Sequence, residues 1–351
     1  MSEEILLCSD CFKDEGLKIN AYHIGLTDEK NCPNCNSAKG RKLNRQLIDK
    51  LTYQFFVIGT IHKTDFGGAP IVQSNEQHKD KTDIEVSVWL KADLKILTKF
   101  GTMGLFYYGP RLWMIGEIEP LKSLLNKKER KEIIKNILEK YPSKTINSDN
   151  YFYRVRVNPK IPESINEYCS APVELLGNGR LDSVDLPILY CSEIIDLCLH
   201  ECRVRSEDEI YMAKLKPKTD LKLLDLTELI DENVSEFESL DLAIHFLFLA
   251  GKNSYEVCRQ ICKDAEKAGY DGLIFPSYFS YLATGHIPFE TVYGISIRKI
   301  PSMKEYAKSQ SIPNLALFGR PIRDNKIDVE SINRVVLTKV TYNAIFGPVE
   351  V

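Results

Sequence analysis

The chain contains 351 residues, of which 44% are hydrophobic and 27% are charged, and its formal net charge is −3 at pH 7. This length predicts two or three domains, each large enough to bury a core. The composition excludes a chain that is strongly basic or disordered throughout, so any basic surface must be local.

The apolar segments are too short for a membrane protein. None approaches the length that crosses a bilayer, and the first residues, MSEEILLC, carry acids where a signal peptide carries basic residues. We therefore expect a cytoplasmic protein without a membrane partner. Homo-oligomers are the commonest assemblies of such chains, and we expect one here.

Two cysteine pairs, CSDC and CPNC, indicate a zinc-binding unit over residues 1–45. Cys8, Cys11, Cys32 and Cys35 have the spacing of two knuckles whose thiolates close a tetrahedral shell around Zn²⁺. A complete shell of four thiolates leaves no coordination position for a substrate, so the zinc is expected to be structural. The other cysteines lie mostly in apolar segments and are expected to be core residues, namely Cys191, Cys198, Cys202, Cys258 and Cys262.

A basic segment, KGRKLNRQLIDK, follows the second knuckle at residues 39–50. It could bind the phosphates of a nucleic acid, or it could be the solvated face of a helix. The aromatic residues that single-strand binding uses are missing from it, which favours the solvated face.

A mixed α/β N-terminal domain is expected over residues 46–145. Aromatic and β-branched runs predict strands at YQFFVIGTI (53–61), IEVSVWL (84–90) and GLFYYG (104–109). An amphipathic helix is predicted over residues 121–141. The polar segment PSKTINSDN (142–150) is the best linker in the chain, so the main domain boundary is placed there.

An α+β domain is expected over residues 146–335, followed by a C-terminal strand or tail at 336–351. It opens with the predicted strand YFYRVRV (151–157), and residues 254–277 are typical of a helix, a glycine turn and a short strand. Motifs of common hydrolases and nucleotide-binding enzymes are absent from the sequence: it has no Walker A loop, no Gly-x-Ser-x-Gly elbow and no Gly-x-Gly-x-x-Gly.

Residues 177–202, GNGRLDSVDLPILYCSEIIDLCLHEC, carry the strongest candidate site. Glu201 follows Leu197 and Cys198 at helical spacing, so it is predicted to share their buried face. A buried glutamate needs a partner. Alternatively, Glu201 lies at the helix end and reaches solvent, or it pairs with Arg203 or Arg205.

The residues before this helix suggest a ligand site. Gly177 and Gly179 allow close approach of the backbone, Arg180 offers planar donors suited to phosphate, and Tyr190 ends the short strand LPILY. A strand followed at once by its helix would leave Tyr190 and Glu201 near one end of a sheet.

These motifs resemble the RES domain, a family named for an arginine, a glutamate and a serine. The resemblance covers roughly residues 150–335, and the segments that carry it are YRVRV, GRLDSVDLPILY, LHE, GYDGLIFPS and PNLALF. The knuckles and the strands after them are similar to the HEPN/RES N-terminal region that accompanies some RES domains.

The resemblance implies a mixed β-sheet core with helices of the ADP-ribosyltransferase type, which binds NAD and breaks its nicotinamide–ribose bond. The chain would be an NAD glycohydrolase, or an NAD phosphorylase that uses inorganic phosphate and yields ADP-ribose 1''-phosphate. It would serve as a bacterial toxin or defence effector, with an antitoxin or regulatory protein as partner. Alternatives are a mono-ADP-ribosyltransferase acting on protein or nucleic acid, and a zinc-ribbon binding protein with a degenerate RES domain.

Carried over from the family, the catalytic residues would be Glu201, Arg180, Ser277 and Tyr190. Glu201 would stabilise the ribose cation in a dry pocket, and Ser277 would bond the ribose or the amide. Arg180 would grip the pyrophosphate, and Tyr190 would stack on nicotinamide. Arg154, on the opening strand beside Arg156, would also bind NAD.

The sequence departs from the family pattern just after Arg180. Leu181 replaces the usual aromatic residue, and Asp182 and Asp185 add negative charge that would repel a pyrophosphate if it faced the pocket. The aromatic stretch at residues 277–294 would form a lid that restores stacking, and His286 within it is most simply a surface residue.

Overall fold

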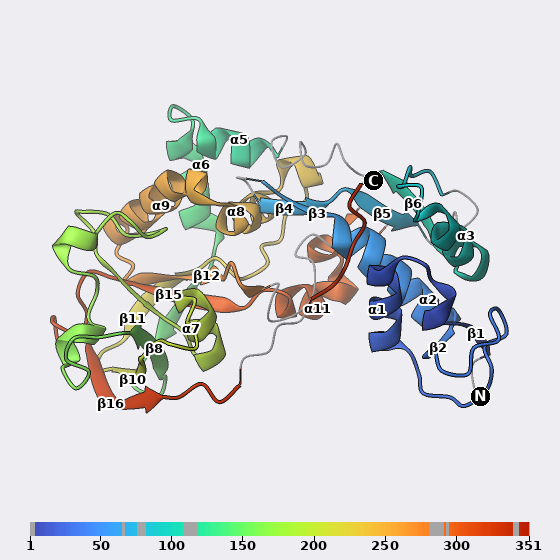
Figure 1. Cartoon of the computed structure of the whole chain (residues 1–351). Helices are drawn as coiled ribbons and strands as arrows, with labels where there is room; N and C mark the ends of the chain where they lie inside the picture. Colours follow the sequence, from blue (N-terminus) through green and yellow to red (C-terminus); the bar gives the residue numbers. More distant parts are fainter. Residues whose placement is uncertain are drawn as a thin grey trace. The chain divides into compact units, whose positions relative to one another are not determined.

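The computed structural model describes residues 4–64, 67–75, 82–107, 118–280, 291–292, 295–339 and 344–350. These residues form two compact units (Figure 1). The first comprises the described residues of Met1–Lys63, Gly68–Trp113 and Thr341–Val351, and the second those of Thr64–Gly67 and Met114–Val340. Among the described residues, no helix combines the length and the apolar character needed to span a bilayer.

The first unit is built around one core. Its elements are β1 (Ile5–Cys8), α1 (Glu15–Ile24), β2 (Lys42–Asn44), α2 (Arg45–Thr52), β5 (Val72–Asn75), α3 (Lys91–Phe100) and β6 (Gly104–Tyr107). The strands form antiparallel pairs, β1 with β2 and β5 with β6, and a further pair joins β3 (Ile61–Thr64) to β4 (Gly67–Pro70). Residues 344–350 also belong to this unit, because the backbone of Phe346 bonds both ends of the Asn20 amide.

Two predicted strands of this region are wrong. YQFFVIGTI continues the helix of α2 through residues Tyr53–Val57 and Ile58–Thr60, and in this position Phe55, Phe56 and Val57 are buried. IEVSVWL contains no strand. Both runs have high β propensity, but their tertiary packing decides their conformation.

The second unit contains two sheets. The five-stranded sheet has the order β7-β11-β12-β15-β9, and the three-stranded sheet has the order β16-β10-β8. Their strands are β7 (Ser143–Ile146), β8 (Phe152–Val157), β9 (Ile188–Cys191), β10 (Ile210–Pro217), β11 (Leu221–Asp225), β12 (Gly272–Pro276), β15 (Pro313–Phe318) and β16 (Ile327–Val335). Apolar residues of both sheets share one core, so the sheets pack face to face.

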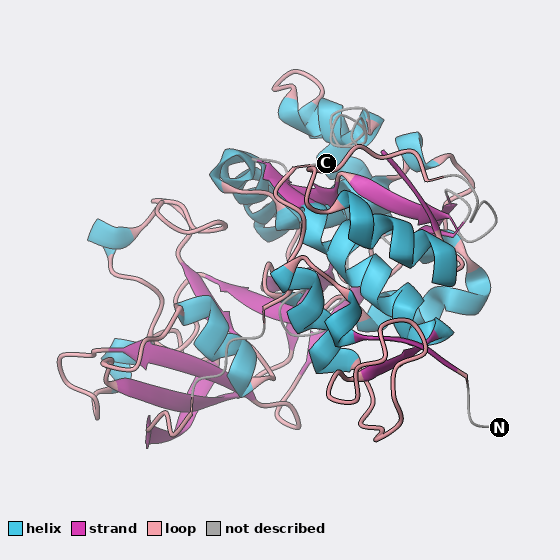
Figure 2. Ribbon diagram, turned by 45° about the vertical axis from the view of Figure 1, so that its right-hand side comes forward, coloured by secondary structure: helices cyan, strands magenta, loops and turns pink. Residues whose placement is uncertain are grey.

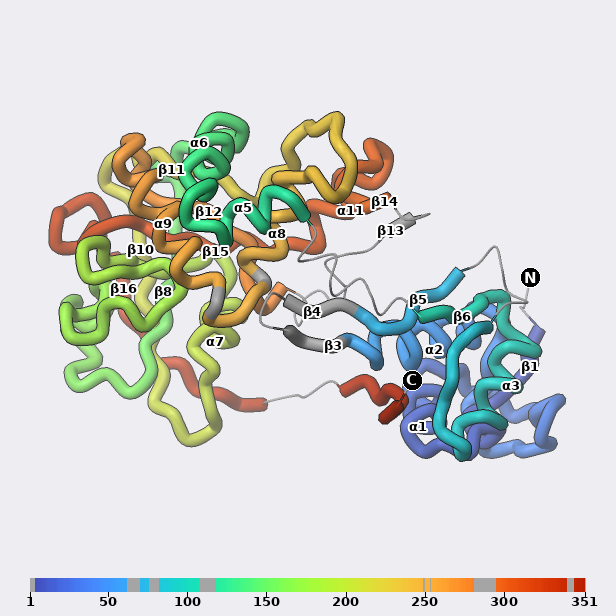
Figure 3. The backbone as a smooth tube through the Cα atoms, turned by 90° about the horizontal axis from the view of Figure 1, so that it is seen from above, coloured from blue at the N-terminus to red at the C-terminus, as the bar shows by residue number. Residues whose placement is uncertain are grey.

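Helices cover the other face of the five-stranded sheet (Figure 3). They are α5 (Glu119–Leu125), α6 (Arg130–Lys140), α8 (Leu240–Leu249) and α9 (Tyr255–Lys267). The stacked rings of Phe248 and Phe275, whose centroids lie 5.3 Å apart, join α8 to β12. The short helix α11 (Lys304–Ser309) precedes β15. The fold is therefore α+β, as predicted, with mixed helices and sheets (Figure 2).

Two features of this unit differ from the sequence analysis. The helix expected over residues 121–141 is broken at Asn126 into α5 and α6, where a run of charged residues offers nothing apolar to bury. Both helices lie before the segment 142–150, in which the main boundary was placed, yet they contribute to the core of the second unit.

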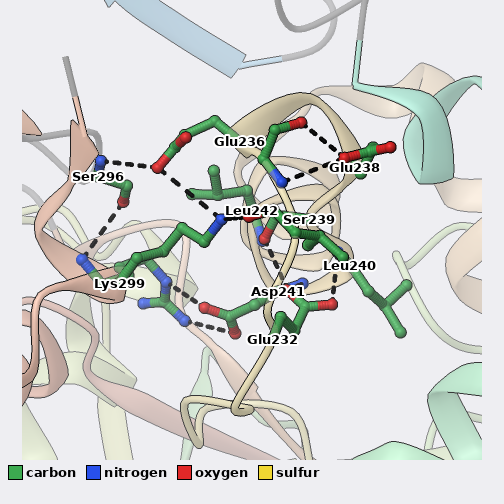
Figure 4. Close-up of polar contacts among 12 residues, drawn as sticks. Glu232, Glu236, Glu238, Ser239, Leu240, Asp241, Leu242, Ser296 and Lys299 are labelled. Carbon is green, nitrogen blue, oxygen red and sulfur yellow. Dashed lines mark hydrogen bonds and ion pairs between the residues drawn. The ribbon is translucent and has the colours of Figure 1, made fainter.

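A buried polar network fixes the start of α8 (Figure 4). Ser239 caps the helix, and the Glu232 carboxylate accepts hydrogen bonds from the Ser239 hydroxyl and from the backbone of Leu240 and Asp241. The Asp241 carboxylate in turn binds the Arg298 guanidinium through two hydrogen bonds of 2.8 and 2.9 Å. This pair ties the segment that follows residue 295 to α8.

Candidate active site

The glutamate singled out from the sequence lies on α7 (Ile195–Cys202), which packs against β8. The buried residues of this helix are Leu197 and Cys198. Glu201 continues their spacing, but it lies in the last turn and is exposed, so the prediction of a buried side chain is wrong. Cys202 is exposed as well, unlike the other cysteines expected in the core.

The Glu201 carboxylate is nevertheless held by the protein. The Ser277 hydroxyl donates to its Oε1 atom over 2.6 Å, and Ser277 is fully buried directly after β12. The Ser277 hydroxyl also accepts the backbone N–H of Phe279, and its own backbone N–H donates to the carbonyl of Ile312. The structure thus brings together the two family residues that lie 76 positions apart in the sequence.

Sequence reasoning missed a third member of this cluster. The Asn314 amide, on β15, donates to the same Oε1 atom over 3.1 Å and is only 5% exposed. Asn314 lies in PNLALF, which was quoted for the resemblance without a role for this residue. An amide that interrupts an apolar strand was the available signal, because buried polar groups need partners.

Tyr190 lies on β9 with its ring against the main core of the second unit. Its hydroxyl accepts the backbone N–H of Leu181 over 2.9 Å and donates to the Asp182 carboxylate over 3.3 Å. Burial and the Asp182 charge raise the pKa of Tyr190 well above its usual value. Tyr190 pairs with Ala316 across the sheet, so Asn314 is its diagonal neighbour on the same face.

Asp182 and Asp185, the two acids that depart from the family pattern, lie in different environments. Asp182 is buried, and its carboxylate accepts the backbone N–H of Gly177 over 2.6 Å in addition to the Tyr190 hydroxyl. Asp185 is exposed and pairs with Lys263 at 3.0 Å. Leu181, which replaces the family's aromatic residue, is fully buried in the core. The hydrogen bonds of the Asp182 carboxylate therefore hold the loop in which this residue lies.

The Arg180 guanidinium bonds the end of α8. It donates to the carbonyls of Leu247 and Ala250 and to the Ser254 hydroxyl, and it lies over the Tyr255 ring. These acceptors include the carbonyls that a helix end leaves unpaired. Among the hydrogen bonds and ion pairs of the described residues, none joins the side chain of Arg180 or Tyr190 to Glu201.

The two arginines of β8 also bond backbone carbonyls. Arg154, which is 7% exposed, donates to the carbonyls of Tyr190 and Cys169 at 2.7 and 3.0 Å. Burial lowers the pKa of Arg154 to about 10. Arg156 donates to the carbonyls of Glu167 and Cys169. In the structure, the two terminal nitrogens of Arg154 thus position β9 and the segment around Cys169, while its buried Nε atom has no hydrogen-bond partner among the described residues.

The predicted lid lies largely outside the described residues. Of the aromatic stretch at 277–294, the structure describes 277–280 and the pair Thr291–Val292, and His286 is not among them. Within the described part, the Phe279 ring stacks with His200 of α7 at a centroid distance of 6.2 Å.

A second cluster fits a metal ion. The Sγ atoms of Cys8, Cys11, Cys32 and Cys35 all lie within 4.8 Å of one another, with separations of 3.4 Å for Cys8–Cys35 and 3.5 Å for Cys11–Cys32. Thiolates at ~2.3 Å from a tetrahedral zinc would lie ~3.8 Å apart. The donor set and its spacing therefore fit Zn²⁺.

A buried lysine supports the second knuckle. The Lys42 ammonium group is fully buried and donates to the carbonyls of Ser37, Ala38 and Gly40. Three carbonyl partners satisfy its three donors, which holds the chain after Cys35 in place.

Residues 152–286 match the family model of the RES domain. No curated protein matches the chain. Among solved structures, a chain of the MbcT–MbcA toxin–antitoxin complex from M. tuberculosis matches with 13% sequence identity and a TM-score of 0.33, covering 58% of this chain and 91% of that chain. The matched family residues include Glu201 and Ser277, whereas Asn314 lies outside them. Residues 152–286 are therefore similar to the RES domain, in agreement with the resemblance expected from the sequence.

Proposed function

We propose that the RES domain of this chain is an NAD-consuming enzyme that cleaves the bond between nicotinamide and ribose. The observation that carries the proposal is the Glu201 carboxylate, which the buried Ser277 hydroxyl holds at 2.6 Å within the residues that match the family. A fixed carboxylate is the group that this reaction requires from the protein, because positive charge develops on the ribose.

The chemistry needs no general acid. When the bond between ribose C1'' and the pyridinium nitrogen breaks, its electron pair stays with nicotinamide, which leaves as a neutral molecule. Glu201 stabilises the oxocarbenium character on the ribose. Because Glu201 is exposed, we propose that bound NAD itself excludes water from the carboxylate and so strengthens its effect.

The second step determines which enzyme the chain is. In a glycohydrolase, a water oxygen bonds to C1'' and releases one proton, which gives ADP-ribose. In a phosphorylase, an oxygen of inorganic phosphate forms that bond and gives ADP-ribose 1''-phosphate.

We propose that Arg180, Arg154 and Tyr190 act mainly by positioning this site. Arg180 holds the loop before β9 against the end of α8, and Arg154 holds the carbonyl of Tyr190 at 2.7 Å. The Tyr190 hydroxyl fixes the same loop through Leu181 and Asp182. Correct placement of binding groups is worth a large share of a reaction barrier, so these residues matter without touching NAD.

We also propose that the four-cysteine cluster holds a structural Zn²⁺. Cys8, Cys11, Cys32 and Cys35 would be its ligands, and the metal would stabilise the first unit without taking part in the reaction.

Product analysis tests the function directly. The purified full-length chain is incubated with NAD, with and without inorganic phosphate, and nicotinamide and the ADP-ribose product are identified by chromatography and mass spectrometry. ADP-ribose alone identifies a glycohydrolase, and ADP-ribose 1''-phosphate that requires added phosphate identifies a phosphorylase. Attachment of ADP-ribose to protein or nucleic acid would identify a transferase instead, and no nicotinamide release would contradict the proposal.

A further inference from the structure

We infer that Asn314 is a positioning residue that fixes the Glu201 carboxylate, so that its Oε2 atom is the oxygen presented to the ribose. The inference rests on the proposed function and adds a residue to the same site. Asn314 lies beyond residues 152–286, which match the family model.

Two donors meet one carboxylate oxygen. The Ser277 hydroxyl and the Asn314 amide both donate to Oε1 of Glu201, at 2.6 and 3.1 Å. Among the hydrogen bonds of the described residues, none goes to Oε2. The carboxylate is therefore anchored through one oxygen, and the other is left for a ligand.

The orientation of the Asn314 amide is determined by its own contacts. Its Oδ1 atom accepts the backbone N–H of Leu315 over 3.2 Å, so its Nδ2 group must be the end that faces Glu201. At 5% exposure, an amide without both partners would be costly. Asn314 therefore presents a donor, and not an acceptor, to the carboxylate.

The sheet places both donors on one face. Asn314 pairs with Phe275 of β12, and the backbone N–H of Ser277 donates to the carbonyl of Ile312 over 2.9 Å. Side chains alternate along a strand, so Phe275, Ser277 and Asn314 project to the same side. The ladder between β12 and β15 thus sets the spacing of the two donors.

Glu201 needs such donors because of its place on α7. It lies in the last turn of the helix, where unpaired carbonyls carry partial negative charge and disfavour a carboxylate. An exposed glutamate would also rotate about its last bonds and exchange its two oxygens. Hydrogen bonds from Ser277, directly after β12, and from Asn314 on β15 offset the unfavourable charge and prevent the rotation. Such preorganisation is what electrostatic catalysis requires.

Two substitutions test the inference. Asn314→Leu keeps the size of the side chain without the donor, and Asn314→Asp keeps the shape but replaces the donor by a second carboxylate. We expect kcat for nicotinamide release to fall about 10- to 100-fold in Asn314→Leu, because a hydrogen bond to a charged group is lost. The KM for NAD should change by no more than about threefold, because NAD does not touch Asn314. Asn314→Asp should lose more activity, since two carboxylates repel each other.

A matched control separates the expected fall in kcat from any general effect of removing a buried amide. Asn20→Leu makes the same change at 4% exposure in the first unit, where the amide bonds the backbone of Phe346. It should leave kcat unchanged. Circular dichroism identifies a variant that does not fold, and in that case the isosteric Asn314→Asp carries the test.

A second measurement does not depend on activity. Carboxyl signals of ¹³C-labelled glutamate are recorded by NMR at one pH, and the Glu201 signal is assigned through its loss in Glu201→Gln. This signal should shift in both Asn314 variants, because the carboxylate loses a hydrogen-bond donor. It should keep its position in Asn20→Leu.

The two measurements keep the inference and the proposed function apart. A fall in kcat together with a shifted Glu201 carboxyl signal supports the inference. An unchanged Glu201 signal overturns it, whatever the kinetics, and an unchanged kcat in an active enzyme overturns it as well. If the wild type releases no nicotinamide, the proposed function fails, and the carboxyl signal alone decides whether Asn314 fixes Glu201.

Discussion

Asp182 illustrates how a single residue can mislead when only its charge is known. It follows Arg180 closely in the sequence, and an acid that faced a pyrophosphate would weaken its binding. In the structure its carboxylate is buried and accepts hydrogen bonds from Gly177 and Tyr190. The acid therefore stabilises the turn before β9, and the exposed Asp185 is offset by Lys263.

Arg180 leads to a prediction about stability. Its guanidinium satisfies two carbonyls and a hydroxyl at the end of α8. Arg180→Ala should therefore lower the free energy of unfolding by about 1–3 kcal/mol, because buried acceptors lose their partners. Urea denaturation measures the change. Arg205→Ala, at an exposed arginine after α7, is the control and should cost less than about 0.5 kcal/mol. Equal stability of both variants would show that the α8 contacts of Arg180 do not support the fold.

At the scale of elements, the sequence analysis succeeded where the hydrophobic pattern was long and regular. β8, α9 and β12 lie where the periodicity and the glycine turn predict them. It failed for Tyr53–Val57, where β-branched and aromatic residues continue a helix. Propensity is a weak signal when neighbouring elements supply the packing.

The site was predicted only in part, because one of its residues is brought into place by the pairing of two strands. The family resemblance names Glu201 and Ser277, and the structure joins them. Asn314 meets them through the antiparallel register of β12 and β15, which no spacing within one segment reveals. The exposure of Glu201 could not be read from helical spacing either, because it depends on what covers the last turn of α7.

The zinc knuckles give a prediction for the first unit. Metal analysis of the full-length chain should find about one zinc per chain, and Cys32→Ser should lose it because three thiolates do not close the shell. The first forty or so residues should become protease-sensitive in this variant. Cys202→Ser removes an exposed thiol outside the cluster and should keep the metal. Full zinc content in Cys32→Ser would contradict the assignment.

The ion pair at the start of α8 predicts a large effect on folding. Both side chains of the Arg298–Asp241 pair are less than 10% exposed, at 5% and 7%. Asp241→Asn leaves a buried guanidinium without its counter-charge, so the free energy of unfolding should fall by about 3–5 kcal/mol. Asp185→Asn makes the same change in an exposed pair and should cost at most about 1 kcal/mol. Similar losses in urea denaturation would show that burial does not set the strength of these pairs.

At the scale of the whole molecule, a RES domain is joined to a unit with a candidate zinc site. If the chain is a toxin that consumes NAD, its induced expression in a bacterium should lower cellular NAD within one generation and stop growth. Expression of Glu201→Gln to the same level should do neither. Growth arrest by both proteins at constant NAD would point to a cause other than NAD cleavage.

The most direct test of the account compares nicotinamide release from NAD by three purified proteins: the wild type, Glu201→Gln and Glu207→Gln. Removing the charge at Glu201 should lower kcat at least about 100-fold, because the ribose cation loses its stabilising carboxylate. Glu207→Gln makes the same change at an exposed residue beyond α7 and should keep the wild-type rate. Wild-type release of nicotinamide by a folded Glu201→Gln would contradict the central claim that this carboxylate carries the reaction.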